Sequence, residues 1–153
     1  MIAEMLPEIK KEKLAEFTDV FCEEGVFTRE QSKRLLSAAK EAGFGLKIHA
    51  DEIVSTGSAE LAAELGAVSA DHLLAVSEQG ICDMAKSETI ATLLPCTAFC
   101  LKKPYAPARK MIDAGCAVAL ASDYNPGSCF TNSIPLMFAL AVIHMGMTLE
   151  EAL

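Results

Sequence analysis

The chain has 153 residues, of which 52% are hydrophobic and 22% are charged. This length and composition predict one packed domain and exclude an intrinsically disordered chain, because enough apolar surface is present to offset the entropy of ordering. The formal net charge of −8 argues against nucleic acid and against an anionic membrane as partners, since both repel an acidic protein.

The sequence also lacks export and membrane signals. No apolar segment reaches the ~20 residues that a membrane span requires, and the first residues do not have the pattern of a secretory signal. None of the six cysteines forms a C-x-x-C pair, and their spacing fits neither a zinc knuckle nor a disulfide framework. We therefore predict a cytoplasmic protein with reduced, mostly buried cysteines.

Helical and extended patterns alternate along the chain. Pro7 suits the first turn of a helix, and a capping box of Thr28 and Gln31 opens the next one, which Gly43 ends. Ser58 is predicted to cap a third helix. The predicted helices cover 7–17, 28–43, 59–65, 77–86, 106–114 and 134–145. The predicted strands cover 19–23, 46–49, 67–73, 89–94 and 116–120.

This alternation of strands and helices predicts an α/β fold with a parallel sheet and right-handed crossovers. The short repeat favours a partial TIM-type (β/α) barrel over a doubly wound sheet, and no glycine-rich nucleotide-binding motif follows any strand. The apolar run at 116–120 is predicted to be a strand buried on both faces. About five units are fewer than the eight that close a barrel. We therefore expect residues 1–153 to form a single domain, the C-terminal portion of such a barrel in a longer protein.

Titratable side chains follow three of the predicted strands. His49 and Glu52 follow one strand, His72 lies at the end of the next, and Asp123 comes just after the last. Carboxyl ends of parallel strands share one edge of a sheet, where such proteins place their chemistry. Each residue also has a simpler interpretation: a surface His-x-x-Glu pair, a core histidine, and an aspartate that starts a turn. Their joint placement favours one site.

The residue types at this edge predict metal-assisted hydrolysis. Imidazole and carboxylate are ordinary ligands of zinc and iron, and a bound cation lowers the pKa of water to about 7. A catalytic metal needs about three protein ligands, whereas only His49 and Asp123 stand out here. The predicted ligand set is incomplete.

Four segments carry a resemblance to a known family. They read K-I-H-A-D-E at 47–52, S-A-D-H-L at 69–73, L-P-C-T-A-F at 94–99 and S-D-Y-N-P-G-S at 122–128. Together with D-V-F-C-E at 19–23, they resemble the imidazolonepropionase family in matching order over essentially the whole chain. That family belongs to the amidohydrolase superfamily of metal-dependent (β/α) barrels.

The resemblance implies an enzyme of histidine degradation. Its small-molecule substrate is 4-imidazolone-5-propanoate, which water opens to N-formimidoyl-L-glutamate. By position, His49 and Asp123 resemble ligands of one zinc or iron ion, and Asp123 also resembles the base that takes a proton from the attacking water. Glu52 and His72 resemble catalytic residues that contact the substrate. The loop residues that resemble the binding site of the propanoate arm are Asn125, Gly127 and Ser128.

The sequence also departs from the family pattern. The H-x-H metal-binding pair is missing, because the only histidines are His49, His72 and His144, and so are the N-terminal strands and the small β-domain. We therefore expect weak or no metal binding and no turnover by this chain alone. Open sheet edges predict a homo-oligomer. Two alternatives stay open: another amidohydrolase, such as a deaminase, and a non-catalytic α/β interaction module that binds through helix 134–145.

Overall fold

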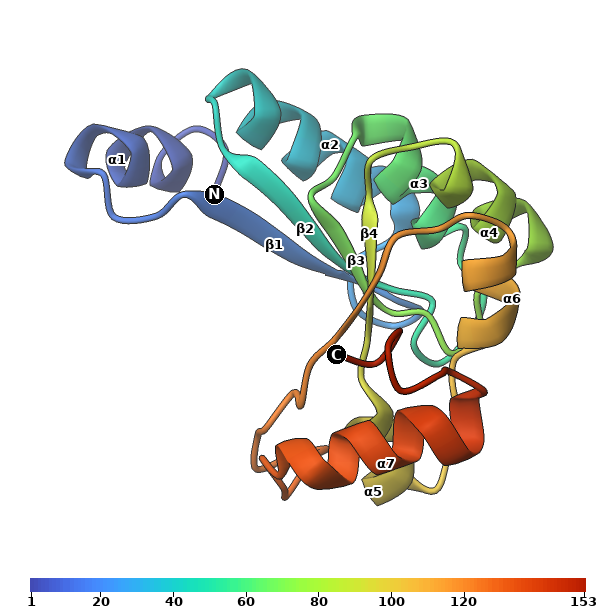
Figure 1. Ribbon diagram of the computed structural model, residues 1–153. Helices are drawn as coiled ribbons and strands as arrows, with labels where there is room; N and C mark the ends of the chain where they lie inside the picture. The colour runs from blue at the N-terminus through green and yellow to red at the C-terminus, as the bar shows by residue number, and fades with distance from the viewer.

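The computed structural model describes all 153 residues, and its centre is one parallel sheet (Figure 1). Each strand pairs in parallel with the next one in the chain, so the order in the sheet is β1-β2-β3-β4-β5. The strands are β1 (Phe17–Cys22), β2 (Gly45–Ala50), β3 (Ser69–His72), β4 (Ile90–Leu93) and β5 (Val118–Leu120). This order confirms the predicted run of parallel βα units.

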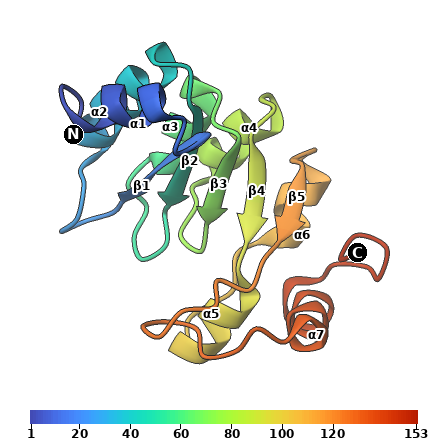
Figure 2. The same cartoon turned by 90° about the vertical axis from the view of Figure 1, so that its left-hand side faces the viewer.

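Seven helices accompany the sheet. They are α1 (Met5–Glu12), α2 (Arg29–Glu41), α3 (Ser58–Leu65), α4 (Glu78–Ala85), α5 (Pro95–Leu101), α6 (Ala108–Asp113) and α7 (Ile134–Met145). The helices α2, α3, α4 and α6 lie on one side of the sheet, whereas α5 and α7 lie beyond the carboxyl ends of the strands (Figures 1 and 2). None of the helices has the length and apolar character needed to cross a membrane.

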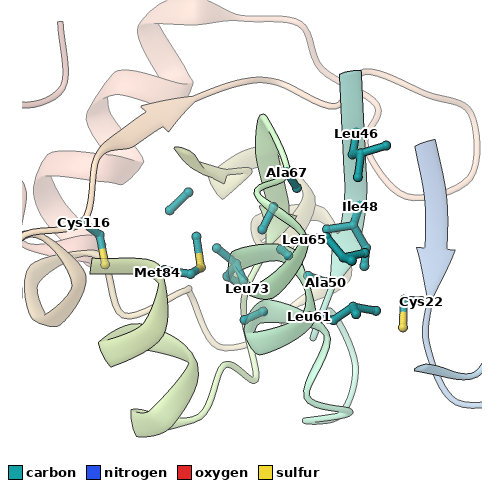
Figure 3. Close-up of a cluster of buried hydrophobic side chains, with 14 of the residues drawn as sticks. Cys22, Leu46, Ile48, Ala50, Leu61, Leu65, Ala67, Leu73, Met84 and Cys116 are labelled. Atoms are coloured by element: carbon teal, nitrogen blue, oxygen red, sulfur yellow. The ribbon is translucent and has the colours of Figure 1, made fainter. Parts of the chain in front are cut away.

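The main core lies between the sheet and the helices on its covered side. Along β2 the side chains of Leu46, Ile48 and Ala50 are buried in this layer, whereas the alternate residues Lys47 and His49 are only half-buried. Figure 3 shows β2 side chains packed with those of α3 and α4. The opposite face of the sheet has no layer of helices over it. The alternation therefore leaves every second side chain, His49 included, on an open face.

Helix ends follow local sequence signals in most cases. Thr28 Oγ1 accepts the Gln31 N–H while Gln31 Oε1 accepts the Thr28 N–H, which is the predicted capping box. Gly66 and Gly146 end α3 and α7 in the left-handed conformation. The capping box of Thr148 and Glu151 also forms, and a single turn follows it.

Three local predictions are wrong. Ser58 is the first residue of α3 rather than its cap, because its hydroxyl bonds to Asp51 instead. The strand β5 is not buried on both faces: Ala119 is exposed, since β5 lies at the sheet edge and only one face of the sheet is covered. The first helix ends at Glu12 rather than at 17, because Lys13 caps it in the left-handed conformation and Phe17 begins β1. Pro95 follows the end of β4, as predicted, and also begins the short helix α5, which was not predicted.

Candidate active-site edge

The predicted site residues lie at the carboxyl ends of β2 and β3 and in the loop after β5. The sheet register aligns Phe21, His49 and Asp71 across β1, β2 and β3. Three residues at the same edge have a strained, left-handed backbone conformation. The φ angles of Asp51, His72 and Asp123 are 47°, 79° and 53°, respectively. Such conformations cost of the order of 1–3 kcal/mol for residues other than glycine and cluster at functional sites.

His49 is held by a carboxylate on the neighbouring strand. Its Nδ1 lies 3.0 Å from Asp19 Oδ2, and its ring centroid lies 5.4 Å from that of Phe21 and 5.2 Å from that of His72. The hydrogen bond with Asp19 raises the pKa of His49 against the opposing effect of burial. With Nδ1 fixed in this way, Nε2 is the ring nitrogen left for other partners.

His72 is buried, with only 2% of its surface exposed. Burial lowers its pKa to about 4, and the neighbouring His49 adds to this effect. Its Nδ1 has no hydrogen-bond partner, and Glu52 Oε1 lies 3.6 Å away, which is beyond hydrogen-bond range. At neutral pH the pair is therefore a neutral imidazole beside a carboxyl group, not an ion pair.

Glu52 follows β2 on a loop that buried polar groups hold. Burial is the main cause that raises the pKa of the Glu52 carboxyl, and the nearby charges of Asp123 and Glu23 act in the same direction. The preceding residue, Asp51, is fully buried and accepts hydrogen bonds from the Thr56, Ser58 and Ala59 N–H groups. The Asp51 carboxylate thus joins this loop to the first turn of α3, where negative charge is favourable.

Asp123 is positioned by a residue that the sequence analysis did not single out. Thr97 Oγ1, fully buried in α5, donates a 2.9 Å hydrogen bond to Asp123 Oδ2. The negative charge of Asp123 raises the pKa values of both Glu52 and His72. The only sequence signal for Thr97 is its place in the 94–99 segment that resembles the family.

The loop that follows Asp123 is held by hydrogen bonds between its own residues. Asn125 Oδ1 accepts the N–H groups of Gly127 and Ser128, both at 2.8 Å, and Asn125 Nδ2 donates to Asp123 O and Ser128 Oγ. The N–H groups of Gly127 and Ser128 are therefore not free for a ligand in this conformation. No hydrogen bond joins Asn125, Gly127 or Ser128 to the histidines.

The metal donors of this chain are incomplete. No group of three or more His, Cys, Asp or Glu side chains is arranged to hold a metal ion, whereas a catalytic zinc ion takes three protein ligands. All six cysteines are free, and four of them are buried, as predicted. None of them belongs to a group of three or more metal donors. The residues present therefore do not fit a metal centre on their own.

Sequence comparison identifies relatives that match the whole chain. No family model matches it, but individual proteins do. The chain is 67% identical over 150 residues to the imidazolonepropionase of Porphyromonas gingivalis and 67% identical over 153 residues to that of Bacteroides fragilis. The identity to the imidazolonepropionase of Clostridium tetani is 65% over 153 residues.

The chain matches one segment of these imidazolonepropionases. The matches cover 98–100% of this chain but only 36–37% of the length of these relatives. Solved structures of lower identity show the same fold over most of the chain. The ochratoxinase of A. niger superposes with a TM-score of 0.71 at 18% identity, covering 99% of this chain and 40% of that one.

Two further structures extend this comparison of folds. A Xaa-Pro dipeptidase has a TM-score of 0.70 at 17% identity and covers 98% of this chain and 44% of its own. The adenosine deaminase of Xanthomonas campestris, solved with bound zinc, has a TM-score of 0.64 at 18% identity and covers 78% of this chain and 30% of its own. The chain therefore has the fold of part of a (β/α) barrel, as predicted.

Proposed function

We propose that this chain forms part of an enzyme that hydrolyses 4-imidazolone-5-propanoate to N-formimidoyl-L-glutamate. One observation carries the proposal: the three residues that resemble the family's catalytic groups, Glu52, His72 and Asp123, all lie at or just after strand ends at the same edge of the sheet in a chain 64–67% identical to imidazolonepropionases. This identity favours imidazolonepropionase over the deaminases of the same fold.

The electrostatics of the edge support acid–base roles for two of these residues. His72 stays neutral at pH 7, so its imidazole can either donate or accept a hydrogen bond to the imidazolone ring. The raised pKa of Glu52 brings its carboxyl closer to the pH at which a proton is transferred efficiently in both directions. We assign the proton transfer to Glu52 Oε1, which faces His72 Nδ1.

The role proposed for the Asn125 loop follows from its chemistry. The hydroxyl of Ser128 and the N–H groups of Gly127 and Ser128 can bind the carboxylate of the propanoate arm. These N–H groups are donated to Asn125 Oδ1 in the structure. Binding of the propanoate through them therefore requires Asn125 to release the loop.

We further propose that His49 and Asp123 supply two ligands of a zinc or iron ion in the complete enzyme. When bound, such an ion would make hydroxide available at neutral pH. His49 Nε2 is the donor atom that the Asp19 hydrogen bond leaves for a metal, and Thr97 holds the Asp123 carboxylate in a fixed orientation. The complete enzyme must provide at least one more ligand from residues that this chain does not contain.

This division of the ligand set gives a direct test. We expect the isolated chain to retain no stoichiometric zinc or iron after dialysis and to show no loss of imidazolone absorbance, because two donors do not make a catalytic metal site. A full-length imidazolonepropionase serves as the positive control in both measurements. One tightly held metal ion per chain would contradict the proposal for His49 and Asp123, and turnover by the full-length control alone would support it.

The open surfaces of the chain support a homo-oligomer, and we propose the cytoplasm as its compartment. The strands β1 and β5 are both sheet edges, and an unpaired edge is a template for another strand. An apolar groove between β5 and α7 adjoins one of these edges, lined in part by Leu120, Met137 and Phe138. Free cysteines are typical of the reducing cytoplasm.

A further inference from the structure

A buried carboxylate that has no role in the function proposed above, Glu23, reaches the loop that carries Glu52. Glu23, the first residue after β1, has only 2% of its surface exposed. Its Oε2 accepts the Ile53 N–H at 2.8 Å, and its Oε1 accepts the Val54 N–H at 3.4 Å and the Glu24 N–H at 2.9 Å. Such donors are what a buried carboxylate needs in place of water.

Glu23 is itself rigidly held. Its N–H donates to Phe27 O at 3.1 Å, and its carbonyl accepts the Val26 N–H at 3.1 Å, so the backbone on both sides of the residue is tied into one tight turn. The neighbouring strand end, Cys22, pairs with Phe27 in an isolated bridge. The Glu23 side chain therefore extends from a fixed point at the end of β1 toward the end of β2.

The loop has little else to fix this part of its path. The side chains of Ile53 and Val54 are 60% and 37% exposed, so they contribute little packing. On the other side of Glu52, Asp51 is anchored through its N–H to Ser58 Oγ and through its carbonyl to the Ala75 N–H. Glu52 thus lies between Asp51, whose N–H and carbonyl are both hydrogen-bonded, and Ile53, whose N–H is bound by Glu23.

Water could satisfy the N–H of an exposed residue such as Ile53 without any protein partner. Burying a carboxylate to bind this N–H is therefore not explained by the need to pair backbone groups. We propose that Glu23 is a positioning residue that fixes the 52–54 backbone and thereby directs the Glu52 carboxyl toward His72. This inference rests on the role proposed above for Glu52, but its geometry can be tested without any activity.

The test uses the 153-residue chain and NMR. In the unaltered protein, we expect a through-hydrogen-bond coupling between the Ile53 amide nitrogen and the Glu23 carboxyl carbon. We also expect a nuclear Overhauser effect between the Glu52 γ-protons and the His72 ring. In Glu23→Gln the Ile53 amide should exchange with solvent roughly 10–100-fold faster, because a hydrogen bond to a charged acceptor is lost, and the Glu52–His72 effect should disappear.

Two control variants separate positioning from general stability. Glu24→Gln removes the adjacent, exposed carboxylate, and Ile53→Ala trims the exposed side chain but keeps the N–H that Glu23 binds. Both should retain the Glu52–His72 effect, whereas a role limited to folding would also change the exchange of core amides such as Ile48 in Glu23→Gln. Retention of the effect in Glu23→Gln would overturn the inference.

If Glu23→Gln does not fold, the unaltered chain alone tests whether Glu23 binds the Ile53 N–H. Absence of the coupling between Ile53 and Glu23 would then refute the contact on which the inference depends, and its presence would support it. None of these readouts involves turnover or a metal. Failure of the proposed hydrolysis would therefore leave the NMR result for Glu23 unchanged, and the two outcomes can be told apart.

Discussion

His72 illustrates how one buried side chain links the site to the stability of the fold. In the folded chain its pKa is about 4, whereas an exposed histidine has a pKa of about 6.5. Between these two values the unfolded chain binds the proton and the folded chain does not. The stability that His72 contributes is thus fully present above pH 6.5 and is lost as the pH falls toward 4.

We therefore expect His72→Asn to flatten the acid side of the stability profile. Asparagine tolerates the positive φ of this position and does not titrate. The unaltered chain should lose about 3 kcal/mol of unfolding free energy between pH 7 and pH 4 through His72, and the variant should not show this loss. Urea unfolding at a series of pH values measures the effect. The exposed His144, replaced by Asn, is the control that should keep the original slope, and an equal slope for both variants would contradict the assignment.

A substitution of Thr97 tests how strongly its hydroxyl holds the Asp123 carboxylate. Thr97→Val keeps the shape of the side chain but removes the hydroxyl that donates to Asp123 Oδ2, so we expect a loss of about 1.5–3 kcal/mol in the free energy of unfolding. Thr92→Val on β4 is the matched control, since Thr92 makes no side-chain hydrogen bond and is half-buried. Equal stability changes in the two variants, measured by urea unfolding, would argue against a held Asp123.

These contacts mark the limit of what the sequence predicts about the site. The placement of His49, His72 and Asp123 at strand ends follows from local patterns, because strand ends can be located from apolar runs and turns. Their partners cannot be located in this way. Asp19 is 30 residues from His49, and Thr97 is 26 residues from Asp123, so only the folded sheet reveals these pairs.

At the scale of single elements, local signals predict most boundaries. The helix α7 begins and ends where Pro135 and Gly146 indicate, and the capping box opens α2 as its spacing requires. The start of α3 is different, because the acceptor for its first N–H groups is Asp51, which reaches it across a turn. A short-range rule for caps assigns this role to Ser58 because the sequence does not show the turn.

Asp51 should therefore be essential to the start of α3. Asp51→Asn replaces one acceptor oxygen by a donor group, which cannot accept both the Thr56 and the Ala59 N–H groups. We expect a loss of about 1–3 kcal/mol in unfolding free energy and faster amide exchange at Ala59. Asp83→Asn, a surface change on α4, should lose much less, and a similar loss in both would exclude a special role for Asp51.

At the scale of the whole molecule, the surfaces without partners determine the behaviour of the chain in solution. The helix α7 is almost entirely apolar, yet Ile134 and Ile143 are 60% and 74% exposed. Its residues Met137 and Leu140 pack in a small second cluster with Cys96 and Cys129, whereas Ala141 and Met145 belong to the main core. A soluble monomer rarely leaves such a surface open, so this end of the molecule is the part most in need of a partner.

We expect the chain to form dimers or larger species, and Ile143→Lys to reduce their stability by placing a charge on this surface. Light scattering coupled to size-exclusion chromatography measures the mass as a function of concentration. Leu14→Lys alters a side chain of similar exposure, 73%, at the other end of the molecule and is the control. A monomer at all concentrations would contradict the prediction, as would equal dissociation of the two variants.

The strand order of the sheet repeats the order of the chain without any reversal. During synthesis, each strand after β1 therefore emerges when the preceding strand, one of its partners in the sheet, has already been made. Sequence separations between paired strands stay short for a parallel sheet, which favours rapid folding. Assembly can thus advance unit by unit, and the free side of β5 is where the next unit would add.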